Sequence, residues 1–142
     1  MICYAVIDTN VLVSALLSGN DDAATVQVVR RLLCGEIVPV FSKEIVREYR
    51  EVLCRAKFGF SPDAVDRLIS SLETDGIFIE PSASGVTLPD MKDLPFYEVV
   101  LEKRKETDAA YLVTGNIKLF PQKPFIVTPR QMLDIILADI EE

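Results

Sequence analysis

Three acidic residues stand at positions where a globular chain usually has apolar or helix-capping side chains. Asp8 directly follows the apolar run of residues 4–7. Glu48 shares a helical stripe with Ile45, and Asp93 stands at the start of a predicted helix. Carboxylates that gather without a cation repel one another, whereas a ligand set made only of oxygen suits Mg²⁺ or Mn²⁺. If a fold gathers these acids, the centre would activate water for attack on a phosphodiester.

Each of these residues also has a simpler structural explanation. Asp8 and Asp93 could cap the helices that follow them, since aspartate is favoured at helix N-termini. Glu48 could lie at the edge of its stripe and pair with an arginine. Asn116 follows another apolar strand and so repeats the pattern of Asp8, but Asn is also a common turn residue after a glycine such as Gly115. Spacing alone leaves both explanations open.

The amino-acid composition excludes several kinds of active site and surface. The 142 residues include no histidine, which excludes an imidazole base and histidine-rich zinc sites. The formal net charge of −7 excludes a strongly basic surface over the whole chain, although local clusters can form among the 15 Lys and Arg residues. Cys3, Cys34 and Cys54 show neither a disulfide framework nor a CxxC pair, so we expect buried thiols in a cytoplasmic protein. No signal peptide or membrane-spanning run is found, and no membrane partner is expected.

Strand and helix patterns alternate along the chain. Strands are predicted at residues 4–7, 37–41, 77–79, 109–114 and 124–127. Helices are predicted after Asp8 and at residues 23–33, 43–55, 61–75 and 96–105, and from Pro129 onward. This alternation predicts an α/β fold of three layers, α/β/α, with a parallel sheet between helices. Residues 1–142 are expected to form a single domain with one sizeable core.

The arrangement resembles the PIN-domain family of ribonucleases across almost the whole chain. Four blocks carry the resemblance: Val6-Ile7-Asp8-Thr9-Asn10, Ser42 with Glu48 six residues later, Asp93-Leu94-Pro95-Phe96, and Tyr111-Leu112-Val113-Thr114-Gly115-Asn116. The chain looks most similar to the branch of toxin components of toxin–antitoxin pairs. The resemblance implies a five-stranded parallel sheet. It also implies a metal-dependent endoribonuclease that cleaves single-stranded RNA with Mg²⁺ or Mn²⁺ as cofactor.

The same resemblance assigns roles to individual residues. Asp8, Glu48 and Asp93 match the first three family acids and are the expected metal ligands. Asn116 stands where the family usually has Asp, so the fourth expected catalytic residue is an amide, which weakens the case for a second metal. Lys92 and Leu94 also make the segment around Asp93 less acidic than is usual for this branch. Four polar residues match positions that would orient the carboxylates or water: Thr9, Asn10, Ser42 and Thr114.

One helix face suggests where RNA would bind. Lys43, Arg47 and Arg50 fall at i, i+4 and i+7 on the helix that carries Glu48, so they share a face. The alternative is a solvated charged face with partners such as Glu51.

Other functions remain open. A phosphatase of the haloacid-dehalogenase type also has Asp after its first strand, but it needs a second Asp where this chain has Asn10. A degenerate PIN fold that binds RNA or a partner without cleavage is favoured by Asn116, and an acidic scaffold without a site is a further reading. The expected partners are RNA, an antitoxin protein and a second copy of the chain, which an exposed Phe58 or Phe60 would serve.

Overall fold

Five parallel strands form one sheet in the computed structural model, which describes residues 2–141. The strands are β1 (Cys3–Ile7), β2 (Ile37–Phe41), β3 (Ile77–Phe78), β4 (Ala110–Val113) and β5 (Ile126–Val127). Their order across the sheet is β3-β2-β1-β4-β5, so β1 lies at the centre. β1 is almost completely buried, which explains why its sequence is a near-continuous apolar run. The predicted five-stranded parallel sheet is confirmed.

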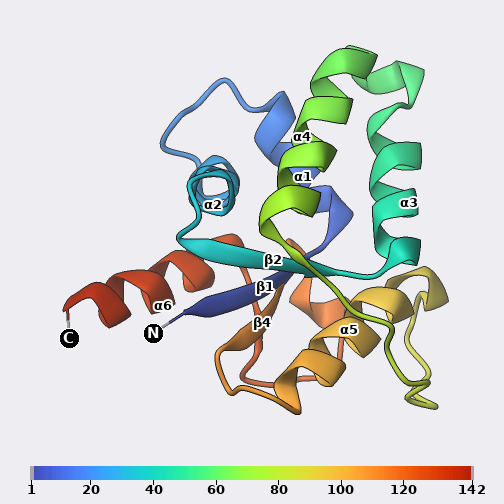
Figure 1. Cartoon of the computed structure of the whole chain (residues 1–142), viewed down its shortest axis with the longest axis vertical. Coiled ribbons are helices and arrows are strands. Elements are labelled where there is room, and N and C mark those ends of the chain that lie inside the picture. Colours follow the sequence, from blue (N-terminus) through green and yellow to red (C-terminus); the bar gives the residue numbers. More distant parts are fainter. Residues whose placement is uncertain (1, 142) are drawn as a thin grey trace.

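Helices cover both faces of this sheet. The α-helices are α1 (Thr9–Leu17), α2 (Ala24–Leu33), α3 (Lys43–Leu53), α4 (Pro62–Asp75), α5 (Leu94–Arg104) and α6 (Pro129–Glu141). α2 and α4 lie on one side of β2, and α5 lies on the other side (Figure 1). The predicted three-layer α/β/α arrangement is therefore confirmed. Among residues 2–141, no helix combines the length and apolar character that crossing a bilayer requires.

The carboxyl ends of three neighbouring strands bring polar residues to one edge of the sheet. Asp8 follows β1, Ser42 follows β2 and Thr114 follows β4. Ile7 is paired with Val113 in the parallel register of β1 and β4. The backbone N–H of Asp8 then donates a 2.9 Å hydrogen bond to the carbonyl of Val113. This register makes Asp8 and Thr114 neighbours, at the edge where parallel sheets bind ligands.

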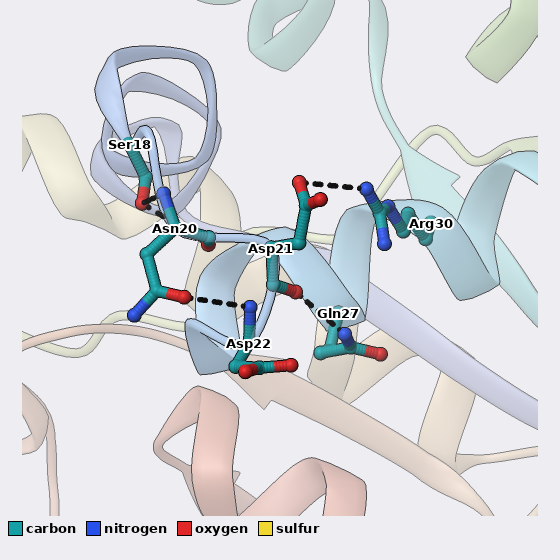
Figure 2. A network of polar contacts seen from close by, with 6 residues as sticks. All are labelled: Ser18, Asn20, Asp21, Asp22, Gln27 and Arg30. Carbon is teal, nitrogen blue, oxygen red and sulfur yellow. Dashed lines mark hydrogen bonds and ion pairs between the residues drawn. The ribbon is translucent and has the colours of Figure 1, made fainter.

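Polar contacts link the residues of the connection between α1 and α2 to one another and to α2 (Figure 2). Asn20 Oδ1 accepts a 2.9 Å hydrogen bond from the N–H of Asp22, and Gln27 Nε2 donates to the carbonyl of Asp21 at 2.6 Å. Asp21 also forms a 2.9 Å ion pair with Arg30. Asp8 precedes α1, whereas this connection follows its other end. Asp21 is therefore an acidic residue that lies away from the carboxyl ends of the strands.

Two helix boundaries lie two residues away from the positions predicted from the sequence. α3 ends at Leu53 instead of Arg55, and Leu53 is fully buried while Val52 is only partly buried. α5 begins at Leu94 instead of Phe96, because a short 3-10 helix, η2 (Met91–Asp93), leads directly into it. Asp93 consequently lies at the junction of the two helices.

Two leucines that belong to consecutive apolar pairs in helices are exposed. Leu33 and Leu137 are 45% and 43% exposed. In each case the preceding residue, Leu32 or Ile136, takes the inward position and is buried. An apolar pair at consecutive helix positions points in two directions about 100° apart, so only one member can face the core.

The expectations for the cysteines and for two phenylalanines need correction. Cys3 is buried as predicted, but Cys34 and Cys54 are exposed because each occupies the C-cap position where the chain leaves its helix. Phe58 and Phe60 are partly buried instead of exposed. They stack on each other with ring centroids 5.7 Å apart, and both pack partly buried against the core.

Candidate active site

Asp8 is held at the end of β1 by a threonine from the neighbouring strand end. Its side chain is 7% exposed, and Thr114 Oγ1 donates a 2.8 Å hydrogen bond to Asp8 Oδ2. Burial raises the pKa of Asp8, while Thr114 and the nearby N–H groups of Asn10 and Thr9 oppose this shift. Asp8 occupies the N-cap position of α1, but its side chain forms no capping hydrogen bond. The hydrogen bond from Thr114, at the neighbouring strand end, shows that capping of α1 is not the only role of Asp8.

Glu48 approaches the same strand end from α3. Its Oε2 accepts a hydrogen bond from Thr9 Oγ1, the residue directly after Asp8. Partial burial raises the pKa of Glu48, and the charges of Asp8 and Glu51 raise it further. The hydrogen bond from Thr9 and the positive charge of Arg55 act in the opposite direction. Glu48 therefore faces the candidate site instead of projecting fully into solvent.

Asp93 reaches the site from the start of α5. Burial raises its pKa to about 6, with smaller contributions from the negative charges of Asp8, Asp90 and Glu48. Its side chain forms no capping hydrogen bond with α5, although it occupies the N-cap position. The capping role in η2 belongs to Asp90, whose Oδ1 accepts a 3.0 Å hydrogen bond from the N–H of Lys92.

Asp8, Glu48 and Asp93 thus act on one another electrostatically. Asp8 raises the pKa of the other two carboxyls, and Glu48 raises that of Asp93. These three side chains share one neighbourhood although they come from three separate elements, and their all-oxygen chemistry suits Mg²⁺ or Mn²⁺. Within residues 2–141, however, no group of three or more Asp, Glu or Cys side chains is arranged so that it could hold a metal ion as it stands.

The match to a known family covers most of the chain. The family model described as the PIN domain matches residues 4–118, which include all three carboxylates. The chain belongs to the PIN-domain family. PIN domains are generally nucleases that use divalent metal ions, so the family indicates a nuclease-type hydrolase. A search of curated proteins and a search of solved structures found no match.

The four residues predicted to orient this PIN domain's carboxylates or water differ in their surroundings. Thr9 and Thr114 each donate a hydrogen bond to a carboxylate. Ser42 is buried and caps α3, where its Oγ accepts a 3.2 Å hydrogen bond from the N–H of Ile45. Asn10 is exposed, and no side-chain hydrogen bond of Asn10 is found within the described part of the chain. Of these four side chains, only those of the two threonines therefore donate a hydrogen bond to an acid within the described residues.

Asn116 lies beside the threonine that holds Asp8. Its backbone N–H donates a 3.1 Å hydrogen bond to Thr114 Oγ1, and its side chain is exposed. It occupies the N-cap position of the short helix η3 (Ile117–Leu119) without a side-chain capping bond. One hydroxyl thus joins Asp8 and Asn116, and this position is compatible with both a turn residue and a residue of the PIN-domain site.

The three cations proposed for RNA are all exposed on α3. Arg50 forms an ion pair with Asp66 of α4 instead of with Glu51. Arg47 lines a groove that contains Glu48, whereas Lys43 is not part of that groove. Arg47 is therefore the member of this set that is best placed beside the carboxylates.

This groove has a volume of about 540 Å³ and runs between α3 and the start of α5. Besides Arg47 and Glu48, its lining includes Arg55, Lys92 and Phe96. Sequence reasoning missed Arg55, whose charge lowers the pKa of Glu48. The spacing of seven residues between them, about two helical turns, is the signal that could have identified it.

Tyr49 is a second residue beside the site that is not among the residues predicted from the sequence. It is 2% exposed, and its hydroxyl donates a hydrogen bond to the carbonyl of Ile7, the residue before Asp8. Burial raises the pKa of Tyr49, and the charges of Asp8 and Glu48 raise it further, so the hydroxyl keeps its proton. Tyr49 fixes α3, and with it Glu48, against the end of β1.

Proposed function

We propose that this PIN domain is a Mg²⁺- or Mn²⁺-dependent endoribonuclease that cleaves single-stranded RNA with metal-activated water. The observation that carries the proposal is the electrostatic coupling of Asp8, Glu48 and Asp93, whose pKa values are all raised. A divalent cation between these carboxylates would relieve their repulsion. The PIN-domain match supports the same class of reaction.

The three carboxylates would have different roles in binding the ion and orienting water. Asp8 and Asp93 would bind the ion, while Glu48 would bind it or orient the attacking water. Thr114 and Thr9 would hold Asp8 and Glu48 in place through their hydrogen bonds. When bound, the ion supplies Lewis acidity, lowers the pKa of water and offsets the negative charge of the phosphate. Overall, a bond forms between the water oxygen and phosphorus, one bond between phosphorus and a ribose oxygen breaks, and that oxygen gains a proton.

A binding module without cleavage is the second candidate. It is favoured by the amide at Asn116 and by the lack, within residues 2–141, of a carboxylate group arranged to hold an ion as it stands. Such a module would still bind RNA or a protein partner at the same edge of the sheet. It predicts RNA binding that does not change when Mg²⁺ or Mn²⁺ is added.

A toxin role is part of the proposal through the resemblance to toxin components of toxin–antitoxin pairs. In that role the nuclease would be held inactive by an antitoxin protein. Growth arrest on induced expression, relieved by Asp8→Ala, would support this role. Unimpaired growth with soluble, active wild-type protein would contradict it.

The direct test of the enzyme is a cleavage assay on labelled single-stranded RNA. Wild-type protein should cleave with Mg²⁺ or Mn²⁺ and should be inactive in EDTA. Asp8→Ala should lose about 10²-fold or more in rate, by analogy with the removal of other electrostatic catalytic groups. Asp21→Ala, in the remote α1–α2 connection, is the matched control and should cleave like wild type. Equal cleavage by wild type and Asp8→Ala at matched purity would refute the assignment.

A further inference from the structure

One segment of the chain has the opposite charge from the whole. Residues 109–133 contain no Asp or Glu and carry three cations, Lys118, Lys123 and Arg130, whereas the full chain has a formal net charge of −7. This is the longest acid-free stretch in the sequence. Because phosphate backbones bind through positive charge, a local basic segment in an acidic protein is a candidate contact surface for nucleic acid.

The fold connects this segment directly to the candidate active site. Thr114, which donates to Asp8, also donates its backbone N–H to the carbonyl of Val127 at 2.9 Å. η3 begins directly after Asn116, and α6 begins two residues after Val127. The chain on both sides of Lys118 and Lys123 is therefore anchored at the strand ends that position the acids.

A cavity of about 470 Å³ opens within the same segment. Its lining combines two cations, Lys118 and Lys123, with two amide side chains, Gln122 and Gln131, and with apolar residues such as Phe120. No carboxylate belongs to this lining. Cations can bind phosphates here, while amide and apolar groups can contact a base or a ribose.

The three cations of this segment form no ion pair with an acidic residue within the described part of the chain. Within the described residues, Lys118, Lys123 and Arg130 are exposed and form no ion pair, in contrast to Arg50, which pairs with Asp66. Arg130 also stands in the first turn of α6, and this first turn contains no acidic residue. A cation there opposes the helix dipole, so local helix stability does not explain it.

We infer that Lys118, Lys123 and Arg130, together called the η3–α6 basic surface, bind the phosphates of single-stranded RNA next to the bond that is cleaved. This inference rests on the proposed RNA-cleaving function and names the surface that holds the substrate. The acidic site by itself repels a polyanion. The basic surface supplies the attraction that brings the strand past the exposed Asn116 to Asp8.

The test separates RNA binding from cleavage. Binding of a fluorescent single-stranded RNA is measured by anisotropy in EDTA, over a series of salt concentrations. The double variant Lys118→Gln/Lys123→Gln removes two phosphate contacts, so the slope of log affinity against log salt should fall in magnitude by about 1.4. This change corresponds to roughly 25-fold weaker binding at about 0.1 M salt, and the difference should vanish near 1 M.

Two controls make the result specific. Lys57→Gln/Arg67→Gln removes the same charge from exposed residues beyond the carboxyl end of α3 and on α4, and it should keep the wild-type slope. Lys118→Arg/Lys123→Arg keeps both charges and should bind like wild type. Unchanged affinity and slope in Lys118→Gln/Lys123→Gln would overturn the inference even if wild type cleaves RNA.

Two further outcomes are informative. If wild type binds RNA through Lys118 and Lys123 but cleaves nothing with Mg²⁺ or Mn²⁺, the surface assignment holds while the nuclease proposal fails. Polyglutamate of matched length serves as the probe for an acidic protein partner. Equal affinity for polyglutamate, with equal sensitivity to Lys118→Gln/Lys123→Gln, would overturn RNA as the occupant of this surface.

Discussion

Thr114 donates a 2.8 Å hydrogen bond to Asp8 although the two residues are 106 positions apart in the chain. The contact exists because β1 and β4 are adjacent parallel strands in register, so the residues after them meet at one edge of the sheet. Thr114 has no exposed surface, and its hydroxyl also accepts from the N–H of Asn116. The arrangement of the strands thus determines the geometry of the first proposed metal ligand.

Removing this hydroxyl should destabilise the protein. Thr114→Val keeps the shape but removes the side-chain donor to the buried carboxylate of Asp8, which should lower the free energy of unfolding by about 1.5–3 kcal/mol. Urea unfolding of the metal-free protein at neutral pH measures the effect. Thr114→Ser retains the hydroxyl and should lose much less. A Val variant as stable as wild type would show that the hydrogen bond contributes nothing.

Neutralising Asp8 should have the opposite effect when no metal is present. Burial and neighbouring acids disfavour the charge at this site, so Asp8→Asn should melt higher than wild type in EDTA, by roughly 2–5 °C for about 1 kcal/mol. Saturating Mn²⁺ should narrow or reverse the order, because only the intact site gains stability from the ion. Thermal melts under both conditions check this. A wild type that melts higher in EDTA and does not respond to metal would contradict the acidic cluster.

The raised pKa of Asp93 predicts a pH dependence. An Asp in an unfolded chain titrates near pH 3.9, whereas in the folded protein Asp93 titrates at about 6. Its extra stability is therefore fully present below about pH 4 and is lost as the pH rises through about 6. In EDTA, wild type should lose stability relative to Asp93→Asn over this interval, as measured by thermal melts. A difference that stays constant with pH would show that Asp93 has an ordinary pKa.

A substitution at Asn116 should increase metal affinity instead of lowering it. If its side chain faces the metal, Asn116→Asp adds a negative charge beside Thr114 and should increase Mn²⁺ affinity severalfold. Cleavage at limiting metal should increase with it. Equilibrium titration with Mn²⁺ gives the affinity, and Asn20→Asp, in the remote α1–α2 connection, controls for the added charge. Equal affinities of wild type and Asn116→Asp would leave Asn116 as a turn residue.

The sequence predicts the sheet better than the helix surfaces. Buried parallel strands such as β1 consist of apolar residues and end in a polar one, so both the strand and the position of Asp8 could be recognised. The exposure of Leu33 was not predictable, because either residue of a consecutive apolar pair can satisfy a helical period. The exposure of Cys34 and Cys54 depends on where each helix ends. Residue type alone does not determine the position of a helix end.

The sequence nominates candidate site residues, but it does not specify the contacts that the structure shows around them. Asp8, Glu48 and Asp93 could be selected by position and resemblance. The hydrogen bond between Thr9 and Glu48 joins residues 39 positions apart, and that of Tyr49 joins α3 to the backbone of β1. Such contacts depend on how α3 packs against the sheet, which no local pattern specifies.

The central claim is that Asp8, Glu48 and Asp93 form a divalent-metal site, and direct Mn²⁺ binding tests it. Isothermal titration compares wild type with Asp8→Asn, Asp93→Asn and the remote control Asp21→Asn, at a pH well above the Asp93 pKa of about 6. We predict that wild type and Asp21→Asn bind alike. Each site variant should bind at least about tenfold more weakly, since changes even in the groups that support metal ligands cost about that much. No binding by wild type, or equal binding by all four proteins, would contradict the account.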